Sequence, residues 1–162
     1  MPSDRRFWLF KSEPGSFSFA DLKSRPGGIE PWDGVRNFQA RNFLRDQVRV
    51  GDGVLFYHSS IPRPAVVGIA RVARAGYPDP TAWDPTSRHF DPRSTPALPG
   101  WFMVDVQYER TFVHEVPLDE LKHHPELAGM VLLQRSRLSV QPVTAAEWSF
   151  ILRLGGIAPE SI

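Results

Sequence analysis

Several residue types and sequence features are missing or scarce in this 162-residue chain, and each absence removes a class of function. There is no cysteine, which excludes disulfides, thiolate zinc sites and cysteine nucleophiles. Nineteen basic against 18 acidic residues leave a formal charge of only +1, so a polybasic coat or tail is not the main means of binding a partner. No apolar run approaches the roughly 18 residues of a membrane span. The run at 7–10 is also too short for a signal peptide, so we expect a cytoplasmic protein without membrane contact.

The chain does contain ample material for a folded core. Hydrophobic residues make up 41% and aromatic residues 12% of the sequence, which is too much for a disordered chain. The length fits one domain better than two, so we assign residues 1–162 to a single domain.

Hydrophobic patterns and capping signals predict an α+β domain. We expect helices at about 18–26, 37–48 and 118–122, and one after Thr144. The first and last carry capping boxes, formed by Ser18 with Asp21 and by Thr144 with Glu147. We expect strands at 7–10, 52–58, 65–73, 101–112, 131–133 and 138–143. Together these predict a small curled mixed sheet or barrel of about six strands, with short helices at its rim.

The segment 76–100 differs from its surroundings because six of its residues are proline. Aromatic residues at 77, 83, 90 and 101 supply material to pack it. We therefore expect a long ordered loop or lid rather than a linker.

The usual catalytic signatures are absent from the sequence. It has no Gly-rich phosphate loop, no dinucleotide fingerprint and no nucleophile elbow. His89 with Asp91, or His123 with His124, could ligate a metal, but neither pair has the spacing of a known site. Solvated surface histidines are the better interpretation, and we expect no metal and no cofactor.

Lys11 and Glu13 flank Ser12 at the end of the first expected strand. A buried lysine beside a carboxylate could form an acid/base pair. A surface ion pair is the simpler alternative.

Arg41, Arg45 and Arg49 recur every four residues, so a regular helix places them on one face. Phe38 projects among them if the helix is regular from its start. The row is either a solvated basic face or a set of phosphate contacts along a nucleic-acid backbone.

Three segments strongly resemble motifs of the EVE domain family: FWLFKSEP at 7–14, WDGVRNFQARN at 32–42, and GD at 51–52 running into FYHS at 56–59. Three further segments are similar to its motifs in the same order: VGIA at 67–70, YPDP at 77–80 and RLSVQPV at 137–143. The resemblance covers about residues 7–155. It implies a PUA-like fold related to YTH domains. It also implies a reader of modified bases in DNA or RNA without established catalytic activity. Because the chain begins directly with the domain, we expect a stand-alone bacterial member.

The resemblance also implies a base pocket. Trp32 matches the tryptophan that forms one wall of an aromatic cage, and either Tyr57 or Tyr77 is expected as the opposing wall. Further matches are Lys11, Ser12 and Glu13 at the pocket floor, and Asn37, His58 and Ser59 around the base edge. The alternative for Trp32 is a core tryptophan that fills the barrel. Two aromatic positions usually occupied by tyrosine are phenylalanine here, at 7 and 38, and the second loses a possible hydroxyl contact.

The function predicted from these residues is a non-enzymatic, monomeric module that binds nucleic acid carrying a modified base. Arg41, Arg45 and Arg49 would contact phosphates. Two alternatives stay open. One is a small hydrolase of modified nucleosides that uses Lys11 and Glu13, because some PUA-like relatives of the ASCH type look like amidohydrolases. The other is an RNA-binding accessory domain without preference for a modification.

Overall fold

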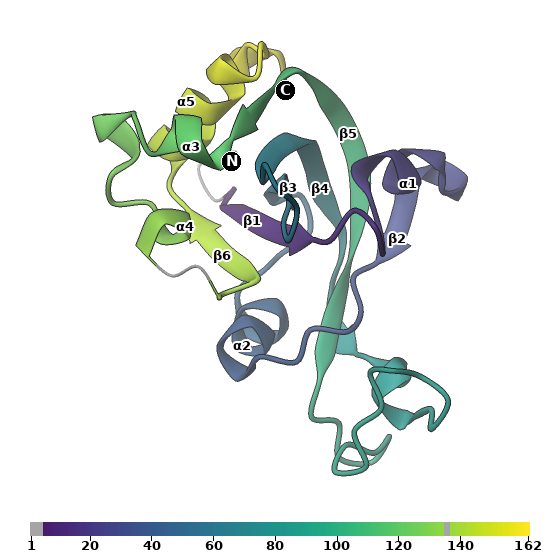
Figure 1. Ribbon diagram of the computed structural model, residues 1–162. Coiled ribbons are helices and arrows are strands. Elements are labelled where there is room, and N and C mark those ends of the chain that lie inside the picture. Colours follow the sequence, from purple (N-terminus) through teal and green to yellow (C-terminus); the bar gives the residue numbers. More distant parts are fainter. Residues whose placement is uncertain (1–4, 135–136) are drawn as a thin grey trace.

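The computed structural model describes residues 5–134 and 137–162, and its centre is a six-stranded sheet in the order β2-β5-β4-β3-β1-β6. β1 (Phe7–Ser12) runs parallel to β3 (Gly53–His58), and the other neighbours are antiparallel. The predicted α+β class is confirmed. The described edge strands, β2 (Ile29–Pro31) and β6 (Val140–Val143), do not pair with each other. The curled sheet therefore stays open and does not close into a barrel (Figure 1).

Each face of the sheet buries its own core, because successive side chains of a strand point to opposite faces. Phe10 and Phe56 belong to one cluster, which α1 (Phe19–Ser24) and α2 (Phe38–Asp46) cover. Leu9 belongs to the other cluster. That second face is covered by α3 (Leu118–Leu121), α4 (Val131–Gln134) and α5 (Ala145–Leu154).

The capping signals of the sequence are confirmed. Ser18 and Asp21 form a reciprocal box at α1, and Thr144 and Glu147 form one at α5. α2 is shorter than expected, since it ends at Asp46.

Two elements differ from the expectation. The predicted strand at 131–133 is wrong, because these residues form α4. A run of three apolar residues is too short to show a hydrophobic periodicity, so the sequence cannot distinguish a strand from a buried helical turn here. β2 is a strand that the sequence pattern does not predict; its three residues pair with β5 (Phe102–Pro117) from Ile29–Gln107 to Pro31–Asp105.

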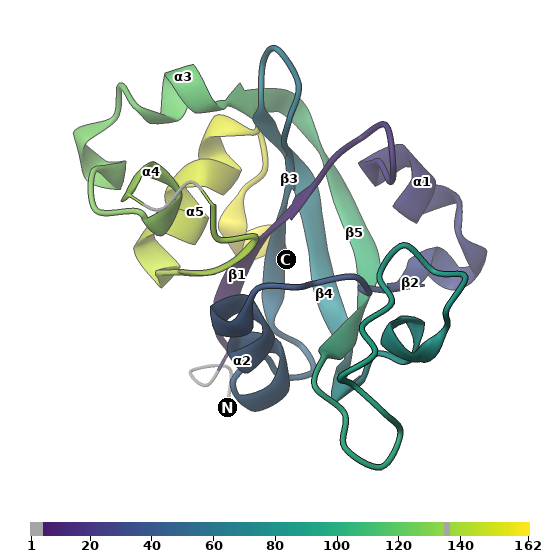
Figure 2. The same cartoon turned by 60° about the horizontal axis from the view of Figure 1, so that its bottom comes forward.

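β4 (Ala65–Pro78) and β5 are long, paired strands that extend beyond the rest of the sheet. Their register shifts in several places, which increases twist and bending. Residues 79–101 connect their outer ends and form a separate, turn-rich lobe, called the lobe below (Figure 2). It includes a short 3-10 helix, Pro80–Trp83, in agreement with an ordered rather than a linker-like segment. Among the helices of 5–134 and 137–162, none combines the length and apolarity needed to cross a membrane.

Candidate nucleic-acid interface

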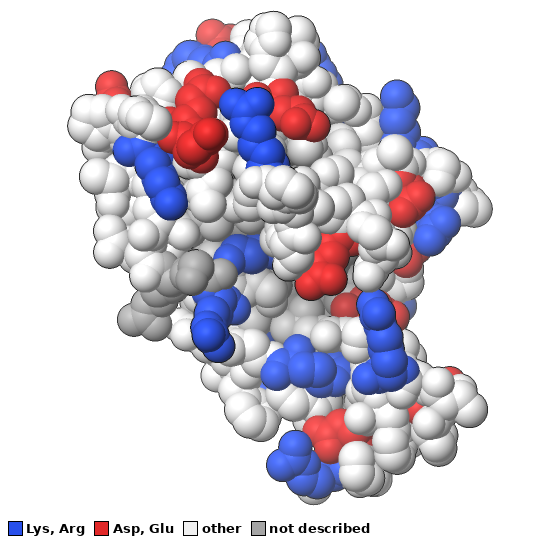
Figure 3. Space-filling view, viewed as in Figure 1, with Lys and Arg blue, Asp and Glu red and all other residues white. Residues whose placement is uncertain are grey.

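A cavity of about 680 Å³ opens between the end of β1, the segment leading into α2, and the lobe. It is called the Trp32 cavity below. Five residues predicted from the sequence line it: Lys11, Ser12, Glu13, Trp32 and Asn37. The volume lies in the range of small-molecule sites. Figure 3 shows a hollow on this face with Lys and Arg side chains on several sides of it.

Trp32 is both a core residue and part of the cavity wall. Only 8% of it is exposed, and its ring lies 5.5 Å from Phe10 and 5.4 Å from Phe56, centroid to centroid. The Trp32 backbone N–H donates to Val104 O at 2.7 Å, which extends the pairing of β2 with β5. Trp32 is therefore a core tryptophan that also borders the cavity.

The other aromatic residue that lines this cavity is Phe17, edge-on to Trp32 at 6.1 Å. Tyr57 and Tyr77, expected as alternatives for the opposing wall, do not line it. Tyr57 is buried in the cluster on the other face of the sheet, and burial raises its pKa to about 12. The Tyr77 hydroxyl donates to Asp105 at the outer part of β4.

The polar walls of the cavity are held by local bonds. Ser12 Oγ donates to Phe17 O at 2.5 Å, and Asn37 Oδ1 accepts from Ala40 N at 2.9 Å as the N-cap of α2. Burial lowers the pKa of Lys11. Asp33 also lines the cavity. Partial removal from water and the nearby Asp79 carboxylate raise the Asp33 pKa.

His58 and Ser59 lie outside the Trp32 cavity. His58 Nε2 accepts from the backbone N–H of Phe19 at 3.1 Å, at the start of α1, so this nitrogen is unprotonated. Burial lowers the His58 pKa, which favours the neutral form that this bond requires. Ser59 lines a smaller cavity of about 400 Å³, together with Tyr57, Lys11 and Glu13.

None of the three arginines predicted to contact phosphates lines the Trp32 cavity. Arg41 Nη1 donates to Gly100 O at 2.5 Å, and Arg45 pairs with Asp46 at 2.8 Å. Arg49 is exposed and follows the end of α2, so a continuous helical row does not form.

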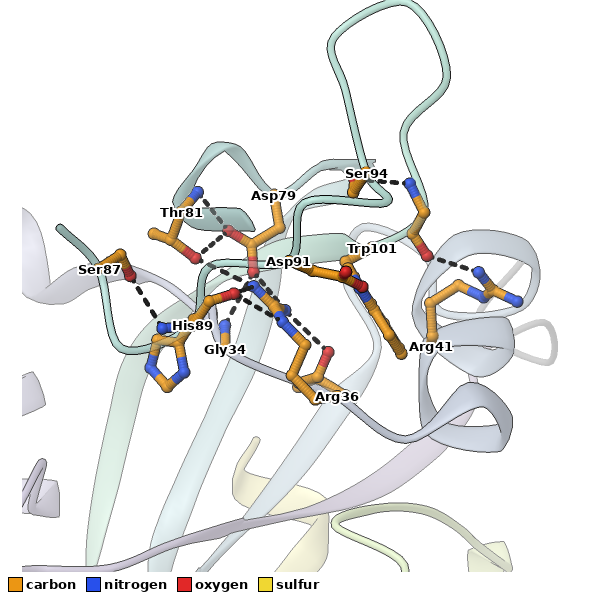
Figure 4. A network of polar contacts seen from close by, with 12 residues as sticks. Gly34, Arg36, Arg41, Asp79, Thr81, Ser87, His89, Asp91, Ser94 and Trp101 are labelled. Atoms are coloured by element: carbon orange, nitrogen blue, oxygen red, sulfur yellow. Dashed lines mark hydrogen bonds and ion pairs between the residues drawn. The ribbon is translucent and has the colours of Figure 1, made fainter. Parts of the chain in front are cut away.

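Sequence reasoning missed the residues that attach the lobe to the Trp32 cavity, shown in Figure 4. Asp79 is fully buried; its Oδ2 accepts from Gly34 N at 2.8 Å and from Arg36 Nη1 at 3.0 Å. Arg36 Nε and Nη2 both donate to His89 O, and Nη2 also reaches Thr81 Oγ1. Arg36 and Asp79 belong to two of the family motifs, at 32–42 and 77–80. No local sequence pattern predicts that they pair with each other, because they are 43 positions apart.

His89, weighed above as a metal ligand, instead contributes its carbonyl to this attachment and its ring to the cavity wall. Residues 5–134 and 137–162 contain no group of three or more His, Asp or Glu side chains arranged to share a metal ion.

Comparison with known sequences supports the resemblance noted from the motifs. The family described as EVE domain matches residues 6–154. Thymocyte nuclear protein 1 of Homo sapiens is 42% identical over 164 residues, 91% of this chain and 72% of that protein. The Danio rerio protein of the same name is 44% identical and covers 91% of this chain and 71% of its own length.

Solved structures also show similarity over nearly the whole chain. A hypothetical protein from Leishmania major is 47% identical, with a TM-score of 0.90 over 96% of this chain and 98% of that one. Human THYN1 protein in complex with 5-methylcytosine-containing DNA is 40% identical, with a TM-score of 0.89 over 95% and 99% of the two chains. An ASCH protein from Zymomonas mobilis, 12% identical with a TM-score of 0.56, shares the fold alone. The chain therefore belongs to the EVE domain family.

Proposed function

We propose that this chain is a DNA-binding module, not an enzyme, and that it holds 5-methylcytosine in the Trp32 cavity. The observation that carries the proposal is the similarity to human THYN1 protein, whose solved complex contains 5-methylcytosine DNA and matches nearly the whole of both chains. The cavity supplies the second support, because residues from distant parts of the chain line it.

The chemistry of the cavity suits a cytosine. The base can donate from its exocyclic amine to the carboxylate of Glu13 or Asp33, and its ring N3 and carbonyl O2 can accept from the ammonium of Lys11. Its methyl group is apolar and fits the Trp32 and Phe17 side of the cavity.

The energetics set the expected affinity. Extruding a base from a duplex costs a few kcal/mol. Stacking on an aromatic ring returns roughly 1–3 kcal/mol per base. Burying one methyl group adds about 0.8 kcal/mol, or about fourfold in affinity. We therefore expect a moderate preference, in which edge hydrogen bonds and phosphate contacts supply the net binding.

Trp32→Phe tests the assignment of the cavity. We expect the wild-type chain to prefer a methylated DNA strand over the unmethylated strand, and the variant to bind the methylated strand roughly fivefold more weakly because part of the stacking surface is lost. Fluorescence polarisation with labelled strands gives both affinities. Trp32→Ala is less suitable, because removing a large buried ring costs about 3–5 kcal/mol of stability.

Trp148→Phe is the matched control, because Trp148 is 3% exposed in the core on the other face of the sheet. It should lose comparable stability and keep the wild-type affinity. Equal affinity of the wild-type chain for methylated and unmethylated DNA would contradict the proposal. Tighter binding of an RNA strand of the same sequence would favour the RNA-binding alternative.

A hydrolase remains the second candidate because Lys11 has a lowered pKa and shares its cavities with Glu13. Burial makes the Lys11 ammonium easier to deprotonate, and a neutral lysine can act as a base. Conversion of 5-methyl-2′-deoxycytidine on incubation with the protein would support this candidate, whereas recovery of unchanged nucleoside would exclude it for this substrate.

A further inference from the structure

A second cavity of about 510 Å³ lies next to the Trp32 cavity. It is called the Arg93 cavity below, after the arginine on its outer side. Arg36, Arg88 and His89 line both cavities and separate one from the other. Phe90 also lines the Arg93 cavity, and 40% of it is exposed.

Of the two arginines in the shared wall, Arg36 has no capacity left for a ligand. A guanidinium carries five N–H donors. Each donor of Arg36 is used within the protein, on Val35 O, Asp79, Thr81 and twice on His89 O. Arg36 therefore holds the wall in place.

Arg88 is the opposite case. It is exposed, and within the part of the chain that the structure describes it makes no hydrogen bond or ion pair. All five N–H donors of its guanidinium are therefore available to a ligand at the boundary of the two cavities. Arg93, in the second cavity, is 84% exposed and pairs with Asp91 at 3.2 Å.

We infer that the Arg93 cavity takes the nucleotide next to the recognised base, and that Arg88 binds the phosphodiester that joins the two nucleotides. The inference rests on the proposed function and extends it from one base to a dinucleotide step. A guanidinium matches a phosphate because it can donate two parallel N–H bonds to two oxygens.

The Arg93 cavity also suits a base of any sequence. The exposed ring of Phe90 offers a stacking surface, and stacking tolerates every base. The only carboxylate in its described lining is Asp91, which accepts from Trp101 Nε1 at 2.8 Å and from Arg93. Its charge is thus engaged within the lobe, and the cavity keeps a positive balance.

Arg88→Gln tests the inference, with Arg63→Gln as matched control. Arg63 is also exposed and makes no hydrogen bond or ion pair among the described residues. It lies in the loop between β3 and β4, away from the lobe (Figure 2). The probes are a short single-stranded thymidine oligonucleotide with one central 5-methylcytosine, the same strand with cytosine, and free 5-methyl-2′-deoxycytidine. Affinities are measured over a series of salt concentrations.

For Arg88→Gln we expect roughly tenfold weaker binding of both strands and a slope of log affinity against log salt that is shallower by about 0.7, the value for one phosphate contact on a single strand. The ratio of the affinities for the methylated and the unmethylated strand should stay unchanged, because both strands carry the phosphodiester. The free nucleoside has no phosphodiester, so its affinity should fall less than that of the strands. Phe90→Ala should weaken strand binding roughly fivefold without changing the slope, because it removes stacking and no charge. Arg63→Gln should leave all values at the wild-type level.

The two proposals fail in different ways. A wild-type chain without preference for the methylated strand overturns the proposed function and this subsite with it. A wild-type preference combined with an Arg88→Gln variant of unchanged affinity and unchanged salt slope overturns the subsite alone. Equal losses in Arg88→Gln and Arg63→Gln also overturn it, since they indicate a general charge effect.

Discussion

Arg36 joins two segments that are 43 positions apart in the chain. Its guanidinium lies against the fully buried carboxylate of Asp79 and holds the carbonyl of His89 through two donors. Lysine cannot reproduce this arrangement, because its ammonium is a single point with three donors. At the residue scale, then, the shape of the side chain matters as much as its charge.

We predict that Arg36→Lys lowers the free energy of unfolding by about 1–3 kcal/mol, because net hydrogen bonds of about 0.5–1.5 kcal/mol each are lost while the positive charge beside Asp79 is kept. Arg36→Met should cost about 3–5 kcal/mol, because it leaves a buried carboxylate without its ion pair. Urea unfolding measures both values.

Arg45→Lys is the control for this prediction. Arg45 pairs with Asp46 at the surface, and both side chains are at least 40% exposed. Surface pairs contribute little, so the change should stay below about 0.5 kcal/mol. A loss in Arg45→Lys as large as that in Arg36→Lys would contradict the role of the guanidinium shape.

At the scale of elements, the turn that follows Trp32 depends on close contact with the lobe. Gly34 has φ +80°, and a Cβ atom added there would lie 2.6 Å from His89 Nε2. Its N–H also donates to Asp79. The turn therefore requires glycine for two separate reasons, backbone conformation and space.

Gly34→Ala and Gly51→Ala separate these reasons, because Gly51 has φ +92° but no heavy atom within 4 Å of an added Cβ. Both variants should lose about 1–3 kcal/mol from backbone strain. Gly34→Ala should lose a further 1–3 kcal/mol or so, because the His89 ring must move. Thermal unfolding compares the two, and equal losses would contradict the contact with His89.

Much of the element structure could be predicted from local signals. Ser18 with Asp21 and Thr144 with Glu147 predict helix starts, because a capping box is complete within four residues. The strand at 131–133 was wrong because three apolar residues have no readable period.

The candidate site was predictable only in part. The family motifs bring Lys11, Ser12, Glu13, Trp32 and Asn37 to one cavity, and the structure places all five there. The attachment of Arg36 to Asp79 and His89 depends on the path of the lobe, which no local pattern contains. Tyr77 shows the same limit, because its hydroxyl donates to Asp105 across 28 positions, a pairing that no local pattern contains.

At the scale of the whole molecule, the lobe depends on two carboxylates whose pKa values are lowered. Asp79 bonds the lobe to Gly34 and Arg36 in the segment before α2, and Asp91 bonds to Trp101 and Arg93 within the lobe. Burial pushes the Asp79 pKa upward, but bonds from Thr81, Gly34 and Arg36 outweigh it and leave the pKa below its ordinary value. For Asp91, bonds from Trp101 and Arg93 lower the pKa to about 2. The unfolded state therefore binds more protons than the folded state in acid.

Their contribution to stability is present above the ordinary carboxyl pKa of 3.8 and is lost as the pH falls toward about 2. We predict that the lobe detaches in this window before the sheet unfolds. Two of the five tryptophans, Trp83 and Trp101, belong to the lobe, so part of the tryptophan fluorescence should change at a higher pH than the far-ultraviolet circular dichroism of the sheet.

Asp91→Asn provides the comparison for the acid response. An amide does not titrate, so the variant should lose part of the fluorescence change below pH 3.8 and retain the later unfolding of the sheet. Coincident fluorescence and dichroism transitions in the wild-type chain would contradict a separately attached lobe.

The lining of the Trp32 cavity has a consequence for how the protein is made. Its walls come from residues 11–17, 25–37 and 88–89, and from Ser139 next to β6. β6 pairs with β1, so β1 acquires its second neighbour in the sheet from residues that are synthesised more than 120 positions later. A nascent chain released before residue 143 lacks that pairing and α5, whose Trp148 stacks on Phe7 of β1. A product truncated before β6 is thus without a finished Trp32 cavity.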